Sequence, residues 1–324
     1  MFTLKQTLQT IEKELYMKKL LLLLAVVSYG AFYSYGQQDK LLTHFIFDKM
    51  SINPGATGVG MDHQICGTAI YRNQWDKFSG APNSVLVNAE ANLSQYFPSA
   101  VGISFYHDAI GYARQNNVTL NYSYHLPLGN GSLGIGAALG LVNYGMNPTW
   151  VTPDGNPNDQ SLPQQGGASN FDANFGLYYM SFTGWYAGLS TTHIPALELK
   201  NLNFNVARHY YAMGGYRWNE AFSVSKLDLE ANVLIRSDFK LMSSDINVRA
   251  IWNNMIYGGL TYRTFDALGI MAGFSMKGFT VGYSYDITLN RVSDISWGSH
   301  EIMLKYCHPL PPIPITKSRN PRYL

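Results

Sequence analysis

Charged residues are scarce in this sequence, and no apolar run is long enough to cross a membrane as a helix. Lys, Arg, Asp and Glu make up 14% of the 324 residues, against about 25% in ordinary soluble domains. The formal net charge is +2, so the chain lacks the strong positive charge typical of nucleic-acid binding, and no nucleic-acid partner is expected. After residue 37 no apolar run approaches the length that indicates a transmembrane helix.

Catalytic and metal-binding patterns are also missing. There is no G-x-S-x-G motif, and the eight histidines are scattered without ligand spacing. The stretch 154–158 begins like a calcium loop, but Asp159 stands where such a loop needs Gly, and Gln165 where it needs Glu. Ser104 and His107 have opposite parity, so in a strand they face opposite sides. No enzyme activity, metal, cofactor or small-molecule substrate is therefore expected.

The N-terminus has the pattern of an export signal. Two lysines at 18–19 precede eight apolar residues at 20–27, and small residues follow before Gln37. A positive start, a short apolar core and small residues before a cleavage point are typical of a secretory signal peptide. Translation is expected to start at Met17, with cleavage near Gly36, so that 1–36 form an N-terminal extension and signal peptide.

Apolar and polar residues alternate along most of the mature chain. Examples are 118–126, 171–177 and 279–287. Such a period of two predicts strands with one apolar and one polar face. About fourteen segments fit the pattern, near 63–75, 80–94, 99–110, 114–128, 131–146, 170–182, 184–194, 207–219, 222–238, 241–253, 254–265, 267–277, 278–290 and 299–308.

The connections between these segments alternate between tight and long. Tight turns are expected at 128–132, 182–184, 218–221, 253–254 and 277–278, and the longer links include 147–169, 195–206 and 291–297. Short periplasmic turns opposite long outer loops are typical of outer-membrane barrels. The sequence therefore predicts an all-β fold: a closed antiparallel transmembrane barrel of about fourteen strands.

The predicted chain has three parts after the signal peptide. The barrel occupies 63–308, preceded by a periplasmic or plug-like segment at 37–62 and followed by a Pro-rich periplasmic tail at 309–324. The stretch 131–145 carries Gly134, Gly136 and Gly140, but its G-x-G-x-x-x-G spacing is one residue too long for a dinucleotide loop. Its glycines are expected to line the inner wall, where the segment before the barrel could pack closely against them.

Charged residues of both signs take the polar parity of the predicted strands. The candidates are Arg72, Glu90, Lys226, Asp228, Glu230, Arg236, Arg249, Asp286 and Glu301. Two interpretations stay open for them: a salt-bridged network that stiffens the wall or holds a plug, and the lining of a selective channel.

The two cysteines lie near the start of the first strand and the end of the last. Closing an antiparallel barrel makes these strands neighbours, and Cys66 and Cys307 both have inward parity. A disulfide could join them in an oxidising periplasm. Barrel shear could instead offset them by several residues and leave two free thiols.

Several segments together resemble the PorP/SprF family of outer-membrane proteins of the type IX secretion system of Bacteroidetes. They include INPGATG at 52–58, YRNQW at 71–75, GAP at 80–82, HDAIG at 107–111 and YSYHLPL at 122–128. The motif positions that we single out are Asn53, Pro54, Tyr71, Arg72, Gln74, Trp75, Gly80, Ala81 and Pro82.

The resemblance implies a barrel in the outer membrane, in contact with its lipid, that serves type IX protein secretion and in some members gliding motility. Such a barrel would bind the C-terminal domain of a secreted cargo, periplasmic proteins of the secretion ring, or both. The alternative is an outer-membrane channel or transporter for small solutes or lipids. The long outer loops at 147–169 and 195–206 are candidates for cargo binding, since loops on rigid scaffolds commonly carry function.

Overall fold

The structure is a computed structural model that describes residues 40–149, 165–196, 198–199 and 204–311. The predicted signal peptide, nearly all of the Pro-rich tail and most of the link 147–169 lie outside these residues. Among the described residues, no helix combines the length and apolar character that crossing a bilayer requires.

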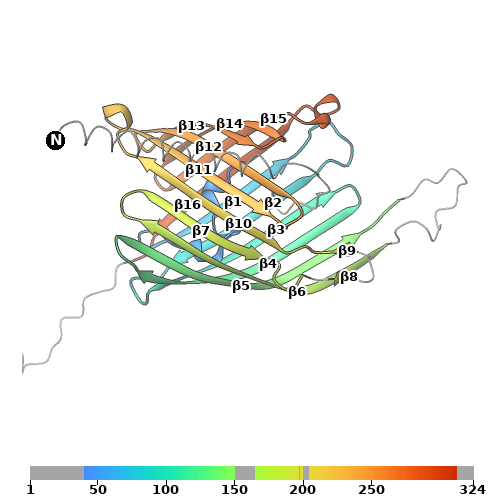
Figure 1. The fold of residues 1–324 in the computed structure, drawn as a ribbon, viewed down its shortest axis with the longest axis horizontal. Helices are drawn as coiled ribbons and strands as arrows, with labels where there is room; N and C mark the ends of the chain where they lie inside the picture. Colours follow the sequence, from blue (N-terminus) through green and yellow to red (C-terminus); the bar gives the residue numbers. More distant parts are fainter. Residues whose placement is uncertain (1–39, 150–164, 197, 200–203, 312–324) are drawn as a thin grey trace, which may run out of the picture.

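Fourteen antiparallel strands close into one barrel, in which β1 pairs with β2 on one side and with β16 on the other (Figure 1). The first seven are β1 (Gln64–Asn73), β2 (Asn83–Asn92), β3 (Ser99–Ile110), β4 (Ala113–Pro127), β5 (Gly131–Met146), β6 (Gly166–Ser181) and β7 (Trp185–Thr192). The others are β10 (His209–Trp218), β11 (Leu227–Ser237), β12 (Met242–Trp252), β13 (Ile256–Arg263), β14 (Ala267–Met276), β15 (Phe279–Thr288) and β16 (Ser299–Pro309). The short β8 (Glu198–Leu199) and β9 (Phe204–Asn205) form a separate two-stranded sheet.

The alternation in the sequence decides which face of each strand is buried. On β4, Val118, Leu120 and Tyr122 are exposed on the outer surface of the barrel, whereas Thr119 and Asn121 are buried inside. Exposed apolar side chains recur at alternate positions on the other strands. An outward apolar band of this kind is the surface that a transmembrane barrel presents to lipid. The predicted barrel is confirmed.

Both ends of the barrel sequence lie at the same rim, because the number of strands is even. The tight turns at 128–130, 182–184, 253–255 and 277–278 lie at this rim, which we assign to the periplasm. The opposite rim carries the links 74–82 and 289–298 and the described ends of the links 147–165 and 193–208.

The predicted alternation of tight and long connections is not strict. At the outer rim, β3 and β4 are joined by only Gly111 and Tyr112. The predicted tight turn at 218–221 was too short, because β11 begins only at Leu227. Glu220, Phe222 and Lys226 have left-handed backbone conformations, which cannot continue an extended strand.

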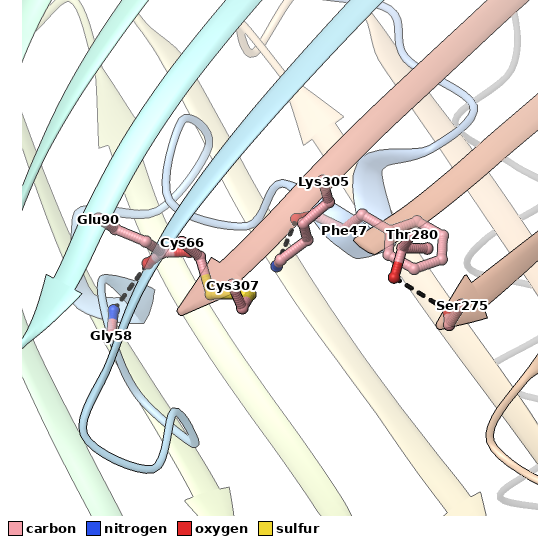
Figure 2. Close-up of a disulfide and its surroundings, with 8 residues drawn as sticks. All are labelled: Phe47, Gly58, Cys66, Glu90, Ser275, Thr280, Lys305 and Cys307. Atoms are coloured by element: carbon pink, nitrogen blue, oxygen red, sulfur yellow. Dashed lines mark hydrogen bonds between the residues drawn. A yellow bond between two sulfur atoms is a disulfide. The ribbon is translucent and has the colours of Figure 1, made fainter. Parts of the chain in front are cut away.

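The seam of the barrel is joined covalently. In the register of β1 and β16, Cys66 lies directly opposite Cys307, and the two form a disulfide with a Cα–Cα distance of 4.1 Å. Figure 2 shows the bridge near the ends of both strands. The same register brings Arg72 opposite Glu301 towards the other rim. The first and last strands are thus held at both ends of their shared ladder.

We predict that replacing Cys66 with Ser lowers the free energy of unfolding by about 2–4 kcal/mol, because the bridge closes a very long loop in the unfolded chain. Urea unfolding in detergent would measure the loss. The variant with Ala at both Cys66 and Cys307 serves as a control, since it loses the same single bridge and should match the Ser variant. Identical gel mobility of the unfolded wild type with and without reductant would contradict the bridge.

Candidate functional site

The barrel encloses a stretch of chain that precedes β1, which we call the inner segment (residues 40–60). It contains two 3-10 helices, η1 (Phe45–Phe47) and η2 (Pro54–Ala56). Asn53 begins η2, because its side-chain oxygen accepts a hydrogen bond from the Gly55 amide at 2.9 Å, as N-cap residues do. Residues 42–58 are buried except for Phe47 and Lys49, which are half-buried. Within the range 37–62 singled out from the sequence, residues 42–58 are therefore enclosed by the barrel wall, whereas Gly60 and Asp62 are exposed.

A cluster of buried charges binds the start of the inner segment near the outer rim. Arg72 contacts Asp286 at 2.8 Å and Glu301 at 3.0 Å, and all three side chains are almost fully buried. Glu301 accepts hydrogen bonds from the backbone amides of Thr43 at 2.9 Å and His44 at 2.7 Å. Both acidic groups from the wall thus bind the Arg72 cation, and Glu301 also binds backbone donors of the inner segment. Such pairing is what makes buried charges tolerable.

Side chains of the inner segment complete this cluster. The Thr43 hydroxyl donates to Asp286 at 2.7 Å and accepts from Arg72 at 3.1 Å. The His44 ring contacts Glu301 through Nδ1 at 2.7 Å. Since Thr43 and His44 come from the inner segment and the three charged groups from β1, β15 and β16, the cluster joins this segment to the seam of the barrel.

A second buried cluster continues the first across the neighbouring strands. Arg263 contacts Asp245 at 2.8 Å and Asp286 at 3.5 Å. Asp245 also pairs with Arg236, which donates to the backbone carbonyl of Lys40 at 3.3 Å. The charges therefore form a continuous chain from β1 around to β11, and each end of that chain contacts the inner segment.

The middle of the inner segment packs backbone against backbone on the glycine-lined wall. A Cβ atom on Gly136 would lie 2.2 Å from the carbonyl carbon of Pro54, and one on Gly134 would lie 2.0 Å from the Gly55 oxygen. The Asn53 side chain donates to the Leu177 carbonyl at 3.0 Å. These glycines are required because any side chain would occupy the space of the inner segment.

The end of the inner segment is bound near the periplasmic rim. Glu90 accepts a hydrogen bond from the Gly58 amide at 2.8 Å, and Asn92 donates to the Gly58 carbonyl at 2.8 Å. Figure 2 shows the first of these contacts beside the disulfide. His125 lies 2.9 Å from the Thr57 carbonyl. Wall contacts thus occur at the start, middle and end of the segment.

Aromatic and charged side chains of the wall contact η1 and the residues that follow it. Phe47 packs on Tyr257 with ring centroids 5.2 Å apart, and the Arg249 guanidinium lies 4.7 Å from the Phe47 ring. The Lys49 ammonium lies 3.6 Å from the centroid of the Tyr186 ring. Burial raises the pKa of the Asp48 carboxyl, although hydrogen bonds from Ser51 oppose this change.

The structure brings together only part of the polar network expected from the sequence. Arg72, Asp286 and Glu301 form one cluster, Arg249 pairs with Glu230 at 2.7 Å, and Arg236 pairs with Asp245. Glu90 binds backbone instead of another charge.

Two members of the expected network lie elsewhere. Lys226 is exposed in the turn before β11, so its inclusion was wrong. Asp228 pairs with Arg217 at 2.6 Å near the periplasmic rim. The prediction also missed His44, Thr43 and Asp245. Asp245 could have been found, because it has the same parity as Arg249 on the same strand.

The motif positions occupy three places. Asn53 and Pro54 lie in the inner segment, Tyr71 and Arg72 lie on β1, and the remaining five lie in the outer link between β1 and β2: Gln74, Trp75, Gly80, Ala81 and Pro82. In that link the Gln74 amide donates to the Pro82 carbonyl at 2.9 Å, and the Trp75 amide donates to Ser299 at 3.1 Å. Among the described residues, no group of three His, Cys, Asp or Glu side chains could hold a metal ion.

The fold and the apolar outer surface define an outer-membrane β-barrel. The chain matches the family model of the type IX secretion system membrane protein PorP/SprF over residues 34–306. It therefore belongs to the PorP/SprF family, and it is a protein of the outer membrane. No match was found among curated protein sequences.

Solved barrels are similar in fold alone. The toluene transporter TbuX of Ralstonia pickettii has 10% identity and a TM-score of 0.50, covering 81% of this chain and 93% of that one. Omp33 of Acinetobacter baumannii has 8% identity and a TM-score of 0.43, covering 76% and 97%. BamA of Haemophilus ducreyi lacking POTRA domains 1–3 has 8% identity and a TM-score of 0.41, covering 76% and 70%.

We predict that replacing Arg72 with Met lowers the free energy of unfolding by about 3–5 kcal/mol, because Asp286 and Glu301 would keep buried charges without their shared cation. Unfolding in detergent, followed by heat-dependent gel mobility, would measure this. Replacing Arg217 with Met is the matched control: its pair with Asp228 is partly exposed, so the loss should be about 0–1 kcal/mol. Equal losses for the two variants would contradict a special role of the Arg72 cluster.

Proposed function

We propose that the chain is an accessory of type IX protein secretion that binds an exported protein at the cell surface and does not act as an open channel. Family membership supports the secretion role. We choose binding over conduction because a segment of the chain occupies the interior: 42–58 are largely buried and are bound to the wall at the start, middle and end of the segment. No catalytic step is assigned.

In this proposal the inner segment is a plug. The Arg72 cluster fixes its start, the wall at Gly134 and Gly136 leaves no gap beside η2, and Glu90 and Asn92 fix its end. Displacing the segment would leave Asp286 and Glu301 without their Thr43 and His44 donors, which is costly for buried acidic groups. The plug is thus expected to stay in place at rest.

The outer links are the proposed surface for the exported protein. The link 74–82 is joined to the link 289–298 by a hydrogen bond from the Asp76 amide to the Gly298 carbonyl at 2.7 Å. Ordered links on a rigid barrel suit recognition of another protein. The expected partner is the C-terminal domain of a type IX cargo, with periplasmic ring proteins as further partners at the opposite rim.

The alternative is a channel or transporter for small solutes or lipids. It gains support only from the likeness in fold to barrels such as TbuX, at 10% identity. Because one fold serves many functions, that likeness does not favour transport for this chain.

We predict that the wild-type protein shows little conductance in a planar bilayer and that replacing Gly136 with Val raises it, because the new side chain occupies the space of Pro54. Replacing Gly145 with Val is the control, since nothing lies within 4 Å of a Cβ there. A large, stable pore in the wild type would contradict the plug, as would equal conductance of the two variants.

We also predict that replacing 291–296 with a Gly/Ser linker lowers retention of the exported protein on intact cells while the barrel still folds. Antibody labelling of the cell surface would measure retention. The same replacement at 220–225, in a connection at the periplasmic rim, is the control and should leave retention unchanged. Full retention in the outer-rim variant would exclude this link as part of the binding surface.

A further inference from the structure

A cavity of about 340 Å³ opens at the outer rim between the ends of β1, β2, β3 and β4. It does not belong to the interior described above. The residues that matter here are Asn73, Asp76, Lys77, Asn83, Ala109 and Arg114. The cavity therefore combines two cations, two amides and one carboxylate at the point where the strands leave the membrane.

The cavity faces the lipid side of the wall. Asn73 has the same parity as Tyr71, which is 47% exposed, and Arg114 has the same parity as Val118 and Leu120 on β4. Since residues at alternate positions of a strand share a face, both side chains project away from the lumen. A ligand of this cavity would approach from the membrane plane or from the rim.

The cavity lies at the depth of the lipid headgroups. Phe105 and Val118 face each other in the register of β3 and β4 and are the last outward apolar pair below it. His107 and Asn116 come next and are joined at 2.7 Å. A rise of about 3.4 Å per residue on a strand tilted by about 40° places Arg114 about 10 Å above Val118, where hydrocarbon has given way to headgroups.

The polar groups of the cavity suit an anion. Lys77 and Arg114 are exposed, and among the described residues the Arg114 Nη1 atom donates hydrogen bonds only to the backbone carbonyls of Gly111 and Ala113, both at 2.7 Å. The cavity also holds one carboxylate, Asp76, which accepts a hydrogen bond from the Asn73 side-chain amide at 3.0 Å, so the two cations leave the cavity with a net positive charge. Lys and Arg are the side chains that bind phosphate most strongly.

An aromatic group beside the cavity supports a lipid as the source of that anion. The Lys77 ammonium lies 3.2 Å from the centroid of the Trp297 ring, and Trp297 is 67% exposed. Exposed Trp side chains are enriched at the membrane interface, where one part of the ring contacts lipid and another contacts water.

We propose that this cavity binds the phosphate group of an outer-leaflet glycolipid. Lys77 and Arg114 contact the phosphate. The acyl chains contact the outward apolar surface that begins at Phe105 and Val118 and continues towards the middle of the bilayer. The lipid would thereby lie against the outer surface of the barrel wall, next to the link 74–82.

Native mass spectrometry of the full chain in detergent tests the site, with diphosphorylated lipid A as the probe. The variant K77Q/R114Q should bind this lipid at least about tenfold more weakly, because two charge-assisted contacts are lost. The control variant K226Q/K277Q removes two exposed cations at the periplasmic rim and should bind like the wild type. Heat-dependent gel mobility would establish that both variants are folded, and R114K should retain binding.

Two further arms identify the source of the phosphate. Lipid A with both phosphates removed should bind the wild type about as weakly as the phosphorylated lipid binds K77Q/R114Q. Inorganic phosphate at equal concentration should not displace the lipid, because it lacks the acyl chains. Undiminished binding to K77Q/R114Q, equal loss in the control variant, tight binding of the dephosphorylated lipid, or displacement by inorganic phosphate would each overturn the proposal.

Discussion

The interior of this barrel depends on how the buried cation of Arg72 is neutralised. Its two acidic partners, Asp286 and Glu301, come from strands more than two hundred residues away in sequence, and both also bind the inner segment. An unpaired charge in this position would be costly, and so would unpaired backbone donors. The barrel closure and the placement of Thr43 and His44 therefore satisfy the same groups. Opening the barrel at the seam, or moving Thr43 and His44 away from it, would therefore leave buried polar groups unpaired.

The inner segment is bound by different physical means along its length. Ionic contacts fix its start, steric exclusion by glycines fixes η2, and hydrogen bonds to Glu90 and Asn92 fix its end. Close backbone packing is sensitive to a single added methyl group, because protein interiors have little spare volume. A segment bound in this way is a defined part of the fold, and its backbone groups satisfy polar groups of the inner wall.

The period of the sequence predicted the strands well because side-chain parity is a local property. The strand predicted at 131–146 coincides with β5. The strand predicted at 222–238 began too early: β11 starts at Leu227, because residues in left-handed conformations precede it. The interior was predicted less completely. Parity indicates that Arg72 and Glu301 face inward, but contacts such as that of His44 with Glu301 depend on how a segment without any period folds inside the barrel. No local signal in 40–60 specifies those contacts.

The seam between β1 and β16 has consequences for how such a barrel can work. Every residue of β1 has a partner on β16, the disulfide joins the two strands at one rim, and Arg72 contacts Glu301 towards the other. Opening the wall sideways at this seam would separate a complete ladder, a covalent bond and a buried ion pair together. With the seam joined and the lumen occupied, the surfaces left for interaction are the two rims and the lipid-facing wall. Recognition at those surfaces requires no rearrangement of the interior, so the proposed binding of an exported protein is compatible with an occupied lumen and a closed seam.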